Sequence, residues 1–65
     1  MKILVNSEAR DVAGPSLAQA LEELGYGDAV IATAVNGEFA PARLRAAMML
    51  HEGDSLELLA PMRGG

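Results

Sequence analysis

The chain has 65 residues, with nine acidic and five basic side chains, a formal net charge of −4, one His and no Cys. A chain of this length forms one small domain with a thin core, and without Cys it has no disulfide to reinforce that core. One His and no Cys leave no ligand set for a structural metal ion. Five scattered cations make no basic patch of the kind that nucleic-acid binding requires. The composition therefore predicts a protein that folds by packing alone and whose partners are proteins with basic surfaces.

Targeting segments and catalytic motifs are missing from the sequence. No apolar stretch approaches the roughly 20 residues that a membrane-spanning helix needs, and the opening run Ile3–Val5 is too short for the core of a signal peptide. The sequence has no Cys nucleophile, no Gly-rich phosphate loop and no Ser/His/acid set with a pocket to hold it. We therefore expect a cytoplasmic protein that binds neither membrane nor nucleic acid and is not itself an enzyme.

The first half of the chain predicts a hairpin followed by a helix. Lys2–Asn6 is short, apolar and β-prone, and turn residues separate it from a second short segment, Ala9–Val12. Ser16 and Gln19 then have the spacing of a capping box, in which each side chain binds a free backbone N–H at the start of a helix. Gly25 suits the left-handed position that ends a helix. Apolar residues at helical spacing form one stripe between them: Leu17, Leu21 and Leu24.

The second half predicts three more strands. Ala29–Val35 is rich in β-branched residues, and Asn36-Gly37 is a strong signal for a type I′ turn into a short strand at Glu38–Ala40. Arg43–Leu50 could form a short helix or only a turn of helix within a long connection, and Ser55–Ala60 alternates as a strand. The predicted fold is therefore α+β, a single mixed five-stranded sheet with one main helix across one face. The domain covers residues 1–60, and residues 61–65 form a flexible tail.

Two exposed leucines are candidates for a docking surface. Strand alternation places Leu4 and Leu59 on the face of the sheet away from the helix. Exposed apolar residues on one face often mark a protein-binding site, although isolated surface leucines are also common. The residues expected to face the helix are Ile3, Val5, Leu56, Leu58 and Ala60.

The closing Gly64-Gly65 is the sharpest chemical feature. Glycine has no side chain, so this ending is flexible and thin, and a narrow channel in a partner could admit it and bring its carboxylate to a reactive centre. The alternative is an ordinary frayed terminus. Met62 and Arg63 lie where such a channel would hold the tail, which we expect to be disordered without a partner.

The whole chain resembles the ubiquitin-like β-grasp sulfur carriers, specifically the ThiS family of thiamine biosynthesis. The matching segments lie in the family's order and cover nearly all of the chain. They are the opening Met1–Asn6, the central Ala34–Glu38, Pro41, the turn and strand at Glu52–Leu59, and the closing Gly64-Gly65. One departure is that Ala42 follows the proline where the family often has a basic residue, which leaves a partner contact by Arg43 in doubt.

The resemblance implies a carrier that other enzymes modify. An E1-like, ThiF-type adenylyltransferase would use ATP and Mg to adenylate the carboxylate of Gly65, and a persulfide from a donor such as a cysteine desulfurase would convert it to a thiocarboxylate. A ThiG-type thiazole synthase would then take the sulfur. Gly64, Arg63 and Met62 would lie in the partner's channel, Leu4 and Leu59 would dock on the partner, and the chain itself would bind no cofactor or metal.

Other residues have plainer interpretations. Met48 and Met49 are expected in the core and on the surface, His51 in a solvated loop, and Glu22 and Glu23 on a solvated helix face. Two other functions fit parts of the sequence. A molybdopterin-synthase small subunit shares the fold and the Gly-Gly ending but is typically longer. A β-grasp regulatory or RNA-binding module would be expected to have a basic face and no need for Gly-Gly.

Overall fold

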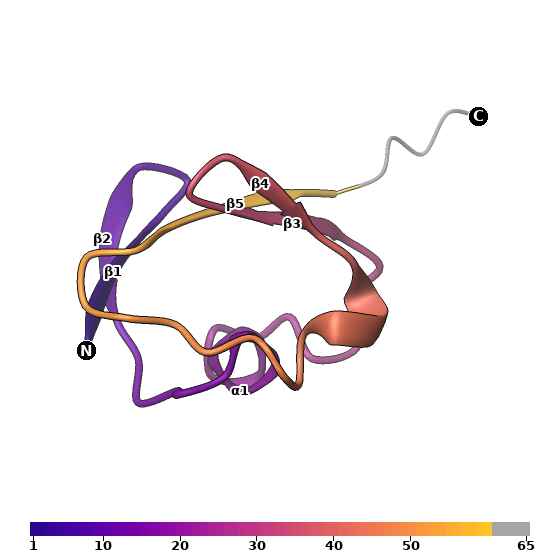
Figure 1. Ribbon diagram of the computed structural model, residues 1–65, viewed down its shortest axis with the longest axis horizontal. Helices are drawn as coiled ribbons and strands as arrows, with labels where there is room; N and C mark the ends of the chain where they lie inside the picture. The colour runs from indigo at the N-terminus through magenta and orange to yellow at the C-terminus, as the bar shows by residue number, and fades with distance from the viewer. Residues whose placement is uncertain (61–65) are drawn as a thin grey trace.

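One five-stranded sheet forms the upper layer of the protein and one α-helix crosses its lower face in the computed structural model (Figure 1). The structure describes residues 1–60. The strand order is β2-β1-β5-β3-β4, so the last strand lies in the middle of the sheet. The elements are β1 Lys2–Val5, β2 Glu8–Asp11, α1 Leu17–Glu23, β3 Ala32–Val35, β4 Glu38–Ala40, the 3₁₀ helix η1 Ala42–Leu44, and β5 Ser55–Leu59. The mixed sheet with one helix confirms the predicted fold.

Two hairpins form the two edges of the sheet. β1 pairs antiparallel with β2, and the turn between them has positive φ at Asn6 (49°) and Ser7 (71°). β3 pairs antiparallel with β4, and Asn36 (51°) and Gly37 (84°) occupy the same region. Positive φ at both central residues is the requirement of a type I′ turn. Both predicted hairpins are therefore confirmed, with β2 shifted by one residue toward the N-terminus.

The helix begins and ends where its local signals predict. The hydroxyl oxygen of Ser16 accepts a hydrogen bond from the Gln19 backbone N–H (3.1 Å), and the Gln19 side chain accepts one from the Ser16 backbone N–H (3.2 Å). Leu24 is the C-cap, and Gly25 follows with φ 93°. This capping box satisfies two backbone donors that a helix start otherwise leaves unpaired.

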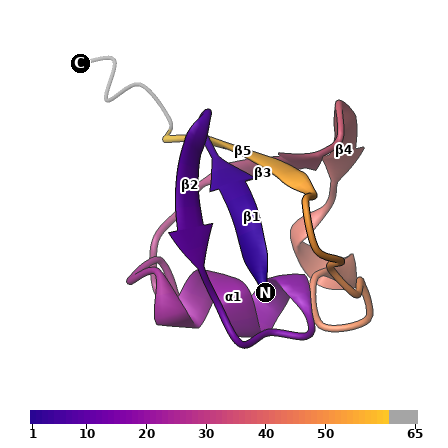
Figure 2. The ribbon, with the colours of Figure 1, turned by 90° about the vertical axis from the view of Figure 1, so that its left-hand side faces the viewer.

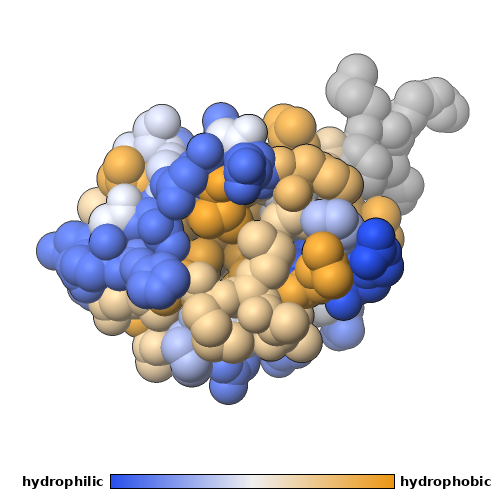
Figure 3. Space-filling view, viewed as in Figure 1, coloured by the Kyte–Doolittle hydropathy of each residue, from blue (hydrophilic) through white to orange (hydrophobic). Residues whose placement is uncertain are grey.

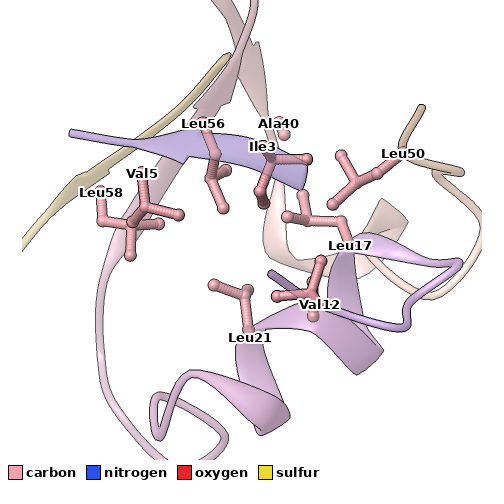
Figure 4. Close-up of a cluster of buried hydrophobic side chains, with 10 residues drawn as sticks. Ile3, Val5, Val12, Leu17, Leu21, Ala40, Leu50, Leu56 and Leu58 are labelled. Atoms are coloured by element: carbon pink, nitrogen blue, oxygen red, sulfur yellow. The ribbon is translucent and has the colours of Figure 1, made fainter. Parts of the chain in front are cut away.

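The core lies between the helix and the concave face of the sheet. β5 joins the hairpins by pairing parallel with β1 and antiparallel with β3. Figure 2 shows the sheet curving over the helix, and Figure 4 shows side chains from the two layers pointing toward each other. The buried apolar residues are Ile3, Val5, Val12, Leu17, Ala20, Leu21, Ala40, Leu50, Leu56 and Leu58.

The strand predicted at Ala29–Val35 is wrong in its first three residues. β3 begins only at Ala32, which is paired with Leu59, the last residue of β5. On the other side, the β4 pairing ends with Thr33 opposite Ala40. Residues 29–31 therefore have no neighbouring strand to bond, and Val30 is 80% exposed. For the same reason the last strand ends at Leu59, and Ala60 is exposed instead of facing the core.

Of the two alternatives predicted for Arg43–Leu50, the short helix is wrong and the single turn of helix within a long connection is confirmed. The segment contains only η1, followed by turns. Its backbone groups bond the residues around the start of α1: Leu17 N–H donates to the Met48 carbonyl and Leu50 N–H donates to the Pro15 carbonyl, both at 2.7 Å. Because these groups bond across to a neighbouring segment, they cannot form an intrahelical ladder.

Candidate functional site

The outer face of the sheet, the face turned away from α1, carries both predicted docking leucines. Leu4 is 41% exposed and Leu59 is 70% exposed, whereas their neighbours Ile3, Val5 and Leu58 are buried. This alternation confirms the predicted orientation of the two side chains, because successive strand residues point to opposite faces. Their docking role stays a prediction.

Leu4 and Leu59 share this face without lying side by side. Leu4 lies opposite Ser55 in the parallel pairing of β1 with β5. Four residues further along β5, at about 3.3 Å per residue, Leu59 is roughly 13 Å away. Glu57 lies between them on the same face of β5. Apolar surface thus flanks one exposed carboxylate.

Sequence reasoning missed Phe39 as part of this surface. Phe39 pairs with Ala34 across the hairpin and is 70% exposed. With Ala32, Ala34 and Leu59 it lines a hollow of about 190 Å³ on the outer face. The signal was present in the sequence, because an Asn-Gly turn fixes which residues of a hairpin face each other.

Apolar exposure continues toward the end of β5. Val30 and Ile31 lie beside Ala32, Leu59 and Ala60, and together these residues line a second, more open depression. Val30 was expected within a strand and lies instead in the loop that borders this depression. The apolar outer face therefore extends to the point where the chain leaves the sheet.

The side chain of Asn6 holds the end of β5 in place. Leu58 N–H donates to Asn6 Oδ1 (2.8 Å), and Asn6 Nδ2 donates to the Leu58 carbonyl (3.3 Å). The Asn6 backbone N–H also donates to the Leu56 carbonyl at 2.9 Å. The amide thus continues the β1–β5 pairing beyond the last residue of β1. Consequently it fixes the backbone that directs Leu58 inward and Leu59 outward.

A second asparagine fixes the beginning of β5. The Ser55 N–H donates to Asn36 Oδ1 (2.9 Å), and Asn36 Nδ2 donates to Asp54 Oδ1 (3.1 Å). The Asn36 amide and the backbone N–H of His51 hold the pKa of Asp54 below its usual range, because hydrogen bonds to a carboxylate stabilise its charged form. Asn36 was expected only to form the turn. The structure shows that it also ties the hairpin to the central strand.

Glu23 has a structural role that the sequence did not reveal. Its carboxylate accepts hydrogen bonds from the backbone N–H groups of Ala13 and Gly14, both at 2.8 Å. These two bonds lower the pKa of Glu23. The expectation that Glu22 and Glu23 lie on a solvated helix face is confirmed, since both are exposed. In addition, Glu23 holds the loop that enters the helix.

The two arginines near η1 differ in position. Arg43 is exposed, whereas Arg45 donates to the Thr33 hydroxyl in β3 (3.2 Å) and to the Ile31 carbonyl just before that strand (2.7 Å). Arg45 is therefore occupied within the fold. A partner contact by Arg43 is not tested by this geometry.

A second apolar surface lies over the connection between β4 and β5. Figure 3 shows it across the middle of the side on which that connection lies in front. The exposed apolar residues of this connection are Ala42, Leu44, Ala46, Ala47 and Met49. Met48 packs against the core and Met49 is 50% exposed, as expected.

The residues predicted to carry the chemistry lie outside the described part of the chain. These are Met62, Arg63, Gly64 and Gly65, and the expected disorder of the tail concerns the same segment. Within residues 1–60 no group of three or more His, Asp or Glu side chains could hold a metal ion. No helix in that part of the chain is long and apolar enough to cross a membrane.

A mixed sheet with a central parallel pair and one crossing helix is the arrangement of the ubiquitin-like β-grasp class. Comparison with known proteins specifies the class further. Residues 3–65 match the ThiS family, and the chain belongs to that family. It is similar over its full length to the crystal structure of a thiamine biosynthesis protein (ThiS) from Geobacter metallireducens. The identity is 28%, all of both chains is covered and the TM-score is 0.84. No curated protein sequence matches significantly.

Family membership places the chain among the small sulfur carriers of thiamine biosynthesis. Carriers of this kind act with enzymes of the pathway. The recognition made from the ordered sequence segments is thereby confirmed.

Proposed function

We propose that this protein carries sulfur as a thiocarboxylate on Gly65 and donates it to thiazole formation in thiamine biosynthesis. The observation that carries the proposal is a match to the ThiS family that extends through the closing Gly64-Gly65. The outer face supports it, because Phe39 and Leu59 expose apolar surface beside the end of the strand that leads to this ending.

The chemistry explains why the carrier needs partners. A carboxylate is a poor electrophile, so the Gly65 oxygen attacks the α-phosphorus of ATP and releases pyrophosphate. The acyl-adenylate that forms has AMP as a good leaving group. A persulfide then attacks the acyl carbon and expels AMP, and a second thiol cleaves the resulting acyl disulfide to leave the thiocarboxylate. The chain has no Cys to supply that sulfur and no phosphate-binding loop to hold ATP.

We assign these missing functions to three partners. A ThiF-type adenylyltransferase supplies the ATP and Mg site, a cysteine desulfurase or similar donor supplies the persulfide, and a ThiG-type thiazole synthase accepts the sulfur. Gly64, Arg63 and Met62 enter the partner's channel, and Leu4 and Leu59 dock outside it. This chain binds no cofactor of its own and acts as a protein co-substrate in the cytoplasm.

Intact-mass spectrometry tests the proposal. The chain is incubated with ATP, Mg, the activating enzyme, a cysteine desulfurase and cysteine, and a Gly65-deleted chain serves as the control. We expect a mass increase corresponding to replacement of one oxygen by sulfur, absent from the deletion. No increase, with an activating enzyme shown to modify another carrier, would contradict the proposal and favour a binding module.

A further inference from the structure

The hollow on the outer face has the size of a site for one long side chain. Its volume is about 190 Å³, below the roughly 300–1,000 Å³ of pockets that bind small-molecule ligands. Most of its wall is apolar, and the residues that line it are Asn6, Ala32, Thr33, Ala34, Phe39, Glu57, Leu58 and Leu59. A partner side chain that fills this hollow needs an apolar stem.

One charge lies on this apolar wall. Among the described residues that line the hollow, Glu57 alone is charged, and within residues 1–60 its carboxylate accepts no hydrogen bond and forms no ion pair. The other polar groups are occupied, since the Asn6 amide bonds Leu58 and the Thr33 hydroxyl donates to the Ala40 carbonyl at 2.8 Å. A partner that covers this face therefore buries a carboxylate, which is costly unless a cation meets it.

We propose that the activating enzyme inserts an arginine side chain into this hollow. Its stem packs on Ala32, Ala34 and Leu59, as long cationic side chains pack on apolar surface. Its guanidinium binds the Glu57 carboxylate. Arginine fits better than lysine because its planar group binds a carboxylate through two hydrogen bonds and also stacks on an aromatic ring, which Phe39 provides.

This inference rests on the proposed function and adds what the partner must present. The activating enzyme is chosen because it must gather an anionic nucleotide and an anionic chain end at one site, which favours a cationic surface around that site. The chain's net charge of −4 agrees with such a partner. Glu57 then selects the correct partner, since an apolar surface without a cation would leave its carboxylate buried and unpaired.

Calorimetric titration of the full chain with the activating enzyme tests the inference. We expect Glu57→Gln and Glu57→Leu each to weaken binding by at least about tenfold, because truncation leaves the partner's cation unpaired, and to reduce the dependence of the Kd on salt. Phe39→Leu keeps the apolar wall and should weaken binding by about threefold through loss of the ring. Glu38→Gln, on the edge strand β4, removes the same charge at a residue that does not line the hollow and should change the Kd by less than about twofold.

Each outcome decides between the two proposals. Binding of Glu57→Leu as tight as that of the unaltered chain, or equal losses in Glu57→Gln and Glu38→Gln, would overturn the arginine contact. If the unaltered chain still gains sulfur in the mass experiment, the carrier function stands without it. No binding by the unaltered chain would overturn both. Thermal unfolding of every variant shows whether a loss of binding arises from a loss of folding.

Discussion

Leucines lie on both faces of the sheet, but they are buried on the inner face and exposed on the outer face. Leu58 and Leu59 are adjacent in β5, yet Leu58 is 7% exposed and Leu59 is 70% exposed. On the inner face leucines pack in the core beside α1, and on the outer face Leu59 lines a hollow that is also bordered by the carboxylate-bearing Glu57. The role of a leucine in this protein therefore depends on the side of the strand from which it projects. Four predictions test that difference, from the largest expected effect to the smallest.

The inner face should determine stability. Leu56 is fully buried, so Leu56→Ala removes core contacts and leaves a cavity. We expect the free energy of unfolding to fall by about 2–5 kcal/mol, a large share of the stability of so small a domain. Leu59→Ala, the matched exposed leucine, should change it by less than about 0.5 kcal/mol. Chemical denaturation of both variants measures the contrast, and similar losses would contradict the division between the faces.

Substitution of Asn6, whose side chain holds the end of β5, should have the next largest effect on stability. Asn6→Ala removes two hydrogen bonds to Leu58 and places alanine at a positive φ. Both changes destabilise the fold, by about 2 kcal/mol together. Asn6→Gly restores the backbone freedom alone and should recover part of the loss. Denaturation curves give the free energy of unfolding of each variant. An Asn6→Ala variant as stable as the original would show that the Asn6 side chain does not hold β5 in place.

The outer face should determine binding. Leu59→Ala is expected to weaken association with the activating enzyme by about 1–2 kcal/mol, or roughly five- to thirtyfold in Kd. Leu44→Ala is the matched control, since Leu44 is also an exposed leucine (41%) but lies in η1, away from the outer face. Titration calorimetry compares the two variants. Equal effects would show that the outer face is not the docking surface.

The smallest expected effect is a change in how strongly acid lowers the stability of the protein. Hydrogen bonds lower the folded-state pKa of Glu23 and of Asp54. Their contribution to stability is therefore complete above the unfolded-state pKa of about 4 and is lost as the pH falls through the lower folded-state values. Glu23→Gln and Asp54→Asn should each make the midpoint of thermal unfolding less sensitive to acid. Glu22→Gln, which neighbours Glu23 in α1, should leave that sensitivity unchanged; an equal change there would argue against the hydrogen-bond explanation.

Predictions from the sequence succeeded where short-range interactions decide the structure. The capping box of Ser16 and Gln19, the end of α1 before Gly25 and the turn at Asn36-Gly37 each depend on residues only a few positions apart. They failed at residues 29–31, and between η1 and β5 they did not decide between a short helix and a single turn. There the outcome depended on the ends of neighbouring strands and on bonds between segments far apart in the sequence.

The features of the candidate site also separate into those that the sequence indicated and those that only the tertiary structure revealed. Alternation alone indicated the outward direction of Leu4 and Leu59, and the ordered sequence segments ending in Gly64-Gly65 indicated the carrier family. Neither showed the hollow. Its walls come from β3, β4, β5 and Asn6 in the β1–β2 turn, and which residues face each other across the strands depends on the register of the whole sheet.

The sequence by itself determined the helix, both hairpins, the inward and outward sets of strand residues and the family, because each is encoded in short-range chemistry or in ordered motifs. The tertiary structure decided where strands end, what Asn6, Asn36 and Arg45 bind, and that Glu57 and Phe39 border one hollow. The physical reason is that these features require hydrogen-bond partners and neighbours that come together only when β5 enters between the two hairpins.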